Sequence, residues 1–201
     1  MSKIIVVVGG SGCGKTDLCE HLIKNYFGED KSELISEDWY YKEEQDDFDT
    51  PDALDLDLLA DHLDKLKNGQ PVEFMSYNMQ NNKRDIPRKL SPDGLFLVEG
   101  LYALNISKIR QSADVSIFID VDPDLRLARR ISRDFEIRKS KLAENGVGYY
   151  IEYYFKYVKP SYDRDIEPER AYADIILNNN VKGIEHLLSA AEKELDKLNL
   201  K

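Results

Sequence analysis

The sequence is poor in cysteine and has no long apolar run. Its 201 residues include two cysteines, Cys13 and Cys19. A disulfide between positions this close would close only a very short loop and would constrain the fold little. The apolar run near the start, residues 4–8, is far shorter than a membrane span or the apolar core of a signal peptide. We therefore expect reduced thiols and a cytoplasmic protein.

Positive charge is scarce relative to negative charge. The chain has 28 lysines and arginines against 38 aspartates and glutamates, which gives a formal net charge of −10. Such a chain repels phosphate backbones and anionic lipids at long range, so we expect neither a nucleic acid nor a membrane as partner. Small molecules are the expected partners, and the composition is compatible with a homo-oligomer.

The pattern of apolar residues predicts one α/β domain. A chain of this length buries a core without disulfides or structural metals, and no internal repeat or low-complexity tract divides it. Short apolar runs alternate with segments of helical periodicity, as βα units do. The expected strands span residues 3–8, 33–36, 94–98, 113–120 and 173–177, and the expected helices span residues 15–26, 54–67, 124–138, 149–164 and 183–198. We predict three layers, with helices on both faces of a parallel sheet of about five strands.

Two polar stretches break this alternation. Residues 40–51 and 71–92 contain prolines and scattered aromatics, as binding loops or a small hairpin do. We expect the substrate to meet the protein there. Residues 71–92 would then be a substrate-facing insertion in a single domain that spans residues 1–201.

The strongest chemical signal is a glycine-rich segment between the first expected strand and the first expected helix. It matches G-x-x-x-x-G-K-[ST] and consists of Gly9, Gly10, Ser11, Gly12, Cys13, Gly14, Lys15 and Thr16. In such a P-loop the backbone N–H groups and the positive end of the helix dipole hold phosphates. Lys15 is placed to reach the β and γ oxygens of ATP, and Thr16 offers a hydroxyl to Mg²⁺. The motif in this context predicts a P-loop NTPase fold.

Two carboxylates follow expected strands and are candidates for the chemistry. Asp38 comes two residues after the second strand, and we expect it at the carboxyl end of a strand beside the P-loop, where it would accept a hydroxyl proton. The alternative is a helix cap or a solvated loop carboxylate. Glu99 directly follows a buried strand, which is the position of a Walker B acid that steadies Mg²⁺. The alternative for Glu99 is a simple strand-ending turn.

Arginines gather on one face of the expected helix 124–138. Arg126, Arg130 and Arg133 recur at i, i+4 and i+7, with Arg129 close by. On an acidic chain such a face suits phosphate oxygens, so we expect Arg130 to bind the nucleotide and Arg133 to neutralise charge in the transition state. The alternative is pairing with neighbouring carboxylates such as Asp134.

These segments together resemble the uridine kinases and the wider uridine kinase and phosphoribulokinase group of P-loop kinases. The resemblance covers nearly the whole chain and rests on the P-loop and on residues 38–42, 47–55, 98–100, 124–134, 158–160 and 172–176. It implies ATP-dependent phosphoryl transfer to a hydroxyl of a nucleoside-like molecule, with a lid at about residues 134–148. It implies further that Asp38 is the base and that Thr16 and Glu99 bind Mg²⁺.

For the acceptor, the resemblance implies that Tyr41, Phe48, Asp49, Tyr77 and Arg133 help to hold the nucleoside. Phe48 and Tyr77 can stack on a base, and Asp49 can accept hydrogen bonds from ribose hydroxyls. The alternative for the two aromatics is ordinary core packing. The remaining residues that we expect at the acceptor site are Asn82, Arg84 and Arg138.

The chain departs from the uridine kinase pattern in the loop that meets the base, in the lid and on the helix after the lid. Asn82 stands where the family carries a His, Tyr153 where it carries a Gln, and residues 138–140 where it carries Arg-Gly-Arg. A site that reads polar groups discriminates steeply, so these departures leave the acceptor open. Alternatives to a uridine kinase are a kinase for a nicotinamide riboside, pantothenate or a sugar phosphate, or a nucleotide-binding regulator without kinase activity. Residues 82–85 spell N-K-x-D, but they precede Glu99 and follow a polar segment, so they are not a guanine-binding motif and ATP is the expected donor.

Overall fold

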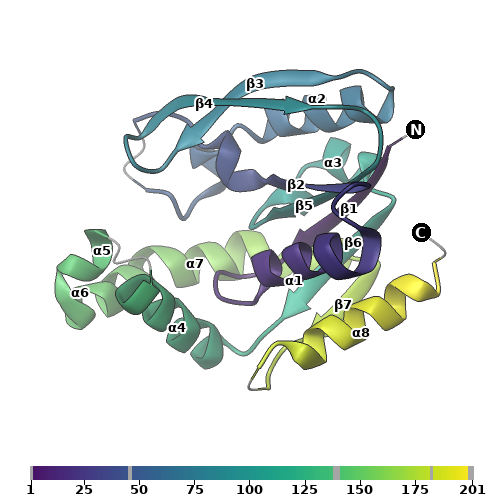
Figure 1. Ribbon diagram of the computed structural model, residues 1–201. Helices are drawn as coiled ribbons and strands as arrows, with labels where there is room; N and C mark the ends of the chain where they lie inside the picture. The colour runs from purple at the N-terminus through teal and green to yellow at the C-terminus, as the bar shows by residue number, and fades with distance from the viewer. Residues whose placement is uncertain (1, 45–46, 138–140, 182, 199–201) are drawn as a thin grey trace.

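The computed structural model describes residues 2–44, 47–137, 141–181 and 183–198. Its centre is a parallel sheet whose five strands lie in the order β2-β5-β1-β6-β7 (Figure 1). The strands are β1 (Lys3–Val8), β2 (Ser32–Ser36), β5 (Leu95–Gly100), β6 (Val115–Asp120) and β7 (Ile175–Asn178). The predicted parallel sheet is confirmed.

Strand β1 shows why these apolar runs carry no polar alternation. Ile4, Val6 and Val8 enter one buried cluster, while Ile5 and Val7 enter another on the opposite face of the sheet. A strand covered on both faces needs apolar side chains at every position.

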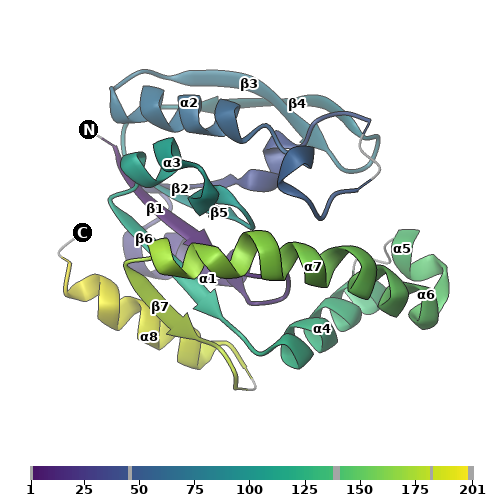
Figure 2. The same cartoon turned by 180° about the vertical axis from the view of Figure 1, so that it is seen from behind.

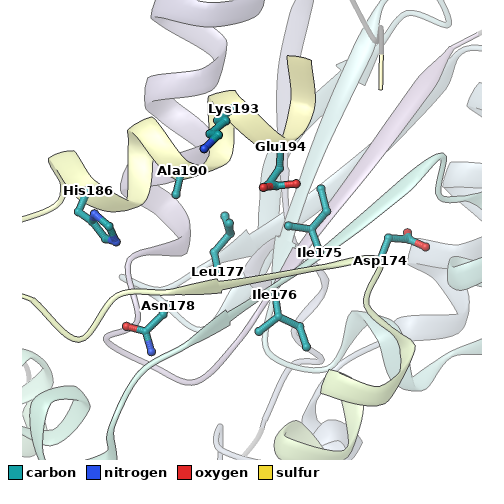
Figure 3. A pocket seen from close by; sticks show the side chains of 9 residues that line it. All are labelled: Asp174, Ile175, Ile176, Leu177, Asn178, His186, Ala190, Lys193 and Glu194. Atoms are coloured by element: carbon teal, nitrogen blue, oxygen red, sulfur yellow. The ribbon is translucent and has the colours of Figure 1, made fainter. Parts of the chain in front are cut away.

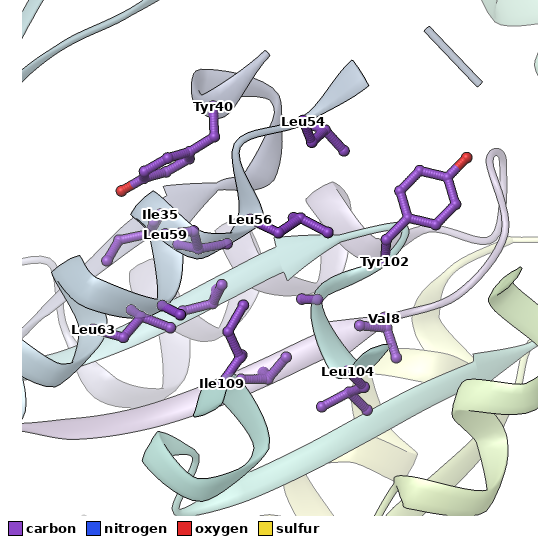
Figure 4. Packing of buried hydrophobic residues seen from close by; sticks show 14 of the residues in the cluster. Val8, Ile35, Tyr40, Leu54, Leu56, Leu59, Leu63, Tyr102, Leu104 and Ile109 are labelled. Carbon is purple, nitrogen blue, oxygen red and sulfur yellow. The ribbon is translucent and has the colours of Figure 1, made fainter. Parts of the chain in front are cut away.

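Helices cover both faces of the sheet and make the predicted three layers (Figures 1 and 2). On one face lie α1 (Lys15–His21), which continues as a π-helical turn at Leu22–Phe27, and α8 (Glu185–Asp196). The other face is covered by α2 (Leu56–Lys67) and α3 (Ser107–Ser112). Figure 4 shows Leu59 and Leu63 of α2 packed with Ile35 and Ile109 in this cluster.

A helical arm follows the sheet at its carboxyl edge. It comprises α4 (Pro123–Ser132) with a π-helical end at Arg133–Ile137, then α5 (Lys141–Glu144) and α6 (Gly146–Tyr153). From α6 the chain continues as a long helix through Tyr154–Val158, α7 (Lys159–Ser161) and Tyr162–Ile166, and ends in a 3₁₀ segment at Glu167–Tyr172. Tyr162 and Ile166 bring this helix back into the core.

The insertion forms a hairpin with a sheet of its own. Strands β3 (Val72–Asn78) and β4 (Lys83–Leu90) pair antiparallel with each other and make a two-stranded sheet separate from the central one. The hairpin lies over α2 (Figure 2). Phe74 fixes it to the core by stacking on Tyr40, with the ring centroids 5.2 Å apart.

Among the described residues no helix is long and apolar enough to cross a membrane.

Three expectations need correction. Strand β2 is not directly beside the P-loop strand, because β5 lies between β2 and β1. Strand β5 extends through Glu99 and Gly100, so Glu99 belongs to the strand and does not follow it. The short helix α3 was not expected, since its six residues are too few to show helical periodicity.

Candidate active site

The P-loop turns at the carboxyl end of β1 and leads into α1. Gly12 has φ of 84°, and a Cβ built there would lie 2.7 Å from the carbonyl oxygen of Arg126, so this turn against α4 requires glycine. Helix α1 begins at Lys15, and its first backbone N–H groups face the loop. The ammonium of Lys15 donates to the carbonyl of Gly9 at 2.9 Å. The loop therefore concentrates backbone donors and one cation at the helix start, which is an anion site.

Thr16 and Glu99 meet although 83 residues separate them. The Thr16 hydroxyl donates to Oε2 of Glu99 at 2.9 Å, and the Ser36 hydroxyl donates to Oε1 at 3.1 Å. The strand register explains the contact, because Glu99 pairs with Val7 of β1 on one side and with Ser36 of β2 on the other. A hydroxyl and a carboxylate thus sit side by side at the mouth of the P-loop.

This pair suits Mg²⁺ better than a metal that needs a protein cage. Among the described residues no group of three or more His, Cys, Asp or Glu side chains is placed to hold an ion. Mg²⁺ commonly takes one or two protein oxygens and completes its octahedron with phosphates and water. Thr16 and Glu99 supply two such oxygens, so the residues present fit the metal that the P-loop implies.

Asp38 lies in the 3₁₀ turn that follows β2, Glu37–Tyr40. Its side chain is exposed, and its backbone N–H is capped by the hydroxyl of Ser36 at 3.3 Å. The same Ser36 hydroxyl donates to Glu99, so the turn that carries Asp38 is connected directly to the Thr16–Glu99 pair.

Two arginines of α4 hold the fold around the P-loop. Arg126 is buried, donates from Nε to the carbonyl of Val121 at 3.0 Å, and stacks its guanidinium 3.5 Å from the ring centroid of Tyr162. Arg129 donates to the carbonyls of Asn179 and Val181 at 3.0 Å each, which ties α4 to the segment after β7.

Arg133, just after α4, reaches the P-loop itself. Its Nη2 lies 3.4 Å from the hydroxyl of Ser11, while its Nε pairs with Asp134 at 2.9 Å. About 29% of its side chain is exposed, so Arg133 is partly accessible to solvent beside the loop. Arg133 therefore does both things considered for it, because it pairs with the neighbouring Asp134 and also contacts the P-loop.

Arg130 is buried in a polar network that extends away from the P-loop. Its Nη1 and Nη2 bind the two carboxylate oxygens of Asp49 at 2.9 and 3.0 Å. Its Nε donates to the hydroxyl of Tyr150 at 3.0 Å, and that hydroxyl donates to Asp134 at 2.5 Å. Tyr153 donates to Asp49 at 3.1 Å. The network joins the loop before α2 to the helical arm.

The aromatics expected at the acceptor site form one cluster. Tyr41 contacts Phe48 with centroids 5.1 Å apart, and Tyr77 lies 5.6 Å from Tyr41 and 6.1 Å from Phe48. Tyr41 and Tyr77 are buried, and Phe48 is partly exposed. The Tyr77 hydroxyl donates to Oδ1 of Asn82 at 3.2 Å, so Asn82, where we expect a departure from uridine kinases, borders this cluster.

Arg84 holds the hairpin to the segment that follows Asp38. Its guanidinium donates to the carbonyls of Tyr40 and Tyr41 at 2.8 Å each and lies 3.5 Å from Asp55. These contacts fix the aromatic cluster against the turn that carries Asp38. Arg138, also expected at the acceptor site, lies outside the described residues.

The comparisons with known proteins agree with this geometry. Residues 4–182 match the family described as the phosphoribulokinase/uridine kinase family. A uridine kinase of Staphylococcus aureus strain JH9 is 37% identical over 186 residues, which cover 88% of this chain and 87% of that protein. The chain belongs to the phosphoribulokinase/uridine kinase family. It is therefore a P-loop kinase of small molecules.

Solved structures show that the fold of this kinase is shared more widely. A phosphoribulokinase from Rhodobacter spheroides superposes with a TM-score of 0.64 at 17% identity, covering 88% of this kinase and 70% of that chain. A possible uridine kinase from Bacillus stearothermophilus superposes with a TM-score of 0.58 at 16% identity, covering 87% and 88%. At these identities the likeness concerns the fold alone.

Three further residues lie at the site of this kinase, and the sequence patterns did not assign them to it. Asn179 is buried and donates from Nδ2 to the carbonyl of Cys13 at 2.9 Å, so it buttresses the P-loop from the segment after β7. Tyr153, noted only as a departure, binds Asp49. Glu37 is buried beside Asp38. Their partners lie far away in sequence, and only a run of asparagines at 178–180 after a strand gave a local signal.

Buried charges in the helical arm have shifted protonation equilibria. Burial by itself raises the pKa of Asp134, but hydrogen bonds from Arg133 and Tyr150 outweigh it and the pKa is lowered overall. Burial raises the pKa of Tyr150 to about 12. At neutral pH the network therefore contains an ionised Asp134 and a neutral tyrosine that donates to it.

A hollow of about 390 Å³ lies between the edge strand β7 and α8, away from the P-loop (Figure 3). His186 and Asn178 lie at one end of it and Asp174 at the other. Its lining comes from β7, α8 and the residue before β7, and includes none of the residues expected at the active site.

Proposed function

We propose that this kinase transfers the γ-phosphoryl group of ATP to a hydroxyl of a nucleoside or a similar ribosyl compound. The observation that carries the proposal is the Thr16–Glu99 contact at 2.9 Å in front of the P-loop. A hydroxyl and a carboxylate side by side at the start of α1 support a Mg²⁺ site next to the phosphates. The 37% identity to a uridine kinase over most of the chain supports a nucleoside-like acceptor.

The donor side is provided by the P-loop and the arm. Backbone N–H groups at the start of α1 and the ammonium of Lys15 bind the phosphates, and Arg133, in contact with Ser11, stabilises charge on the transferring group. Thr16 and Glu99 would hold Mg²⁺, which when bound offsets phosphate charge.

The acceptor side is provided by Asp38 and the aromatic cluster. Asp38 takes the proton from the acceptor hydroxyl. The oxygen of that hydroxyl forms a bond to the γ phosphorus, and the bond from this phosphorus to the bridging oxygen of ADP breaks. Asp49, oriented by Arg130 and Tyr153, offers carboxylate oxygens to ribose hydroxyls. Phe48, the partly exposed ring of the cluster, is the surface on which a base stacks.

The test is a panel of acceptors incubated with ATP and Mg²⁺, with ADP release as the readout. The panel contains pyrimidine and purine nucleosides, nicotinamide riboside, pantothenate and sugar phosphates. The Lys15→Ala protein serves as the blank for contaminating kinases. We expect at least one nucleoside to be phosphorylated well above this blank. Turnover with only pantothenate or a sugar phosphate, or with none of the panel, would contradict the proposal.

A further inference from the structure

The residue before the proposed base is a buried carboxylate that the mechanism above does not use. Glu37 is 2% exposed. Its Oε1 accepts from the backbone N–H of Leu101 at 3.1 Å, and its Oε2 accepts from the backbone N–H of Tyr102 at 3.0 Å. Glu37 thus ties the turn after β2 to the segment that leaves β5.

The chain leaves space for this contact at one position. A Cβ built on Gly100 would overlap the carboxylate of Glu37 and would lie 2.8 Å from its Cβ. Gly100 has no positive φ, so backbone conformation does not require a glycine there. The close approach of Glu37 does require it.

Two ties therefore fix the turn that carries Asp38. On one side Ser36 donates to Glu99 at 3.1 Å and caps the N–H of Asp38 at 3.3 Å. On the other side Glu37 binds the two N–H groups that follow Gly100. Asp38 lies next to both ties, and each tie ends on β5 or on the residues directly after it.

The segment that Glu37 binds is itself anchored. The hydroxyls of Tyr102 and Ser161 lie 2.9 Å apart, and the N–H of Asn105 donates to the buried Glu169 at 2.7 Å. The long helix after α6 and the 3₁₀ segment at its end thus hold residues 101–105 independently of Glu37. A side chain bound to this segment is bound to a rigid part of the fold.

We propose that Glu37 is a positioning residue that sets Asp38 at a fixed place relative to Glu99 and the P-loop. The proposal rests on the proposed function, because it assumes that Asp38 is the base. A carboxylate at this position must be desolvated, and burial raises the pKa of Glu37 to about 8. An apolar side chain would avoid that cost but would leave the N–H groups of Leu101 and Tyr102 without this acceptor.

A mutant cycle with Asp38 tests the role. Glu37→Ala removes the acceptor, and we expect kcat to fall roughly 10- to 100-fold, because small displacements of a catalytic group have effects of this size. We expect the Kd for ATP, measured by titration, to change by less than about threefold, because the hydrogen bonds of Glu37 go to Leu101 and Tyr102. In the Asp38→Asn background the same Glu37→Ala change should lower kcat by less than about twofold, since the base is already absent.

Two further variants separate positioning from stability. Glu37→Gln keeps one acceptor oxygen and should restore at least roughly a third of the wild-type kcat. Glu169→Gln is the matched control, because Glu169 is also a buried carboxylate that accepts from this segment but is not adjacent to Asp38. We expect Glu169→Gln to change kcat by the same factor whether Asp38 is intact or replaced by Asn.

Three outcomes would overturn the inference. If Glu37→Ala lowers kcat by the same factor in both backgrounds, or weakens ATP binding as much as it lowers kcat, Glu37 is structural and the proposal is wrong. If Asp38→Asn alone retains wild-type kcat, Asp38 is not the base, and the proposal for Glu37 is then wrong as well. A Glu37→Ala protein that does not fold is replaced in the cycle by Gly100→Ala, whose methyl group displaces the same carboxylate.

Discussion

Both carboxylate oxygens of Asp49 accept a hydrogen bond from the guanidinium of Arg130, which lies 81 residues farther along the chain. The side chains of Arg130 and Asp49 are 10% and 11% exposed, so the pair is largely removed from water. A forked pair of this kind fixes the direction of the carboxylate as well as its charge. The protein itself therefore holds the Asp49 carboxylate in one orientation.

Breaking this pair should destabilise the fold. Arg130→Leu leaves the charge of Asp49 buried without its partner, so we expect the free energy of unfolding to fall by about 3 kcal/mol. The double variant Arg130→Leu with Asp49→Leu removes both charges and should lose less than the single variant. Urea unfolding of wild type, both single variants and the double variant checks this. A double variant that loses as much as the sum of the two singles would count against the pair.

Lys15→Ala should abolish most phosphoryl transfer without unfolding the domain. The ammonium donates to the loop's own carbonyl and sulfur atoms, at Gly9, Gly10 and Cys13, so the fold depends little on it. The phosphates lose a cation that binds them in the transition state. ADP release and thermal unfolding of the same preparation test both halves. Turnover close to wild type would contradict the P-loop assignment.

Asp38→Asn should separate binding from chemistry. The amide keeps the volume of the side chain but cannot take a proton, so we expect turnover to fall by roughly 10² to 10⁴, with the lower end favoured by a loose transition state. ATP affinity, measured by titration, should change little. Turnover within a few-fold of wild type would move the base to Asp49 or Glu37, and loss of ATP binding would assign Asp38 to the metal or to the loop.

Asn82→His should increase the use of pyrimidine nucleosides. The exposed Asn82 accepts a hydrogen bond from Tyr77 of the aromatic cluster, and the resemblance to uridine kinases implies a His at this position. We expect wild-type kinase not to favour uridine clearly, because the amide has a different length and donor pattern. The ratio of kcat/KM for uridine to that for the best acceptor, measured in both proteins, is the readout. A wild-type enzyme that already prefers uridine and cytidine strongly would show this inference to be wrong.

His62 should make stability fall on acidification. It is buried between Tyr40, whose hydroxyl lies 3.0 Å from Nδ1, and the ring of Phe74. Burial lowers its pKa to about 4, with Lys65 and Arg84 acting in the same direction and Asp61 and Asp55 against it.

The unfolded chain binds the proton near pH 6.5 and the folded protein only near pH 4, so the free energy of unfolding falls as pH falls through this window. We expect a loss of at most about 3 kcal/mol from this residue. Carboxylates titrate in the same range, so the measurement is the difference between wild type and His62→Gln at pH 7 and pH 4. A difference that does not change with pH would contradict the prediction.

Local patterns in the sequence were sufficient for the central sheet and the P-loop. The unbroken apolar run of β1 and the glycine spacing after it depend on neighbours in sequence, so both were predictable. The order of the strands was not predictable, because the sequence of β2 does not indicate whether β1 or β5 pairs with it. Asp38 was therefore expected one strand closer to β1 than it is.

Several long-range contacts that shape the site were not predicted. Asp49 was expected at the acceptor and Arg130 at the nucleotide, and their direct contact with each other was not predicted. Their pairing follows from the packing of α4 against the loop before α2, which no periodicity in either segment encodes. Glu37 and Asn179 bind backbone groups, and the type of a residue does not reveal which distant backbone group its side chain binds.

The separate sheet of the hairpin has a consequence for how the molecule opens. In the described part of the chain β3 and β4 pair only with each other, whereas β1 has a strand on each side and apolar clusters on both faces. Local opening starts where few contacts must be given up. Amide hydrogens of residues 72–90 should therefore exchange with solvent well before those of β1, and the hairpin can rearrange while the P-loop keeps its shape.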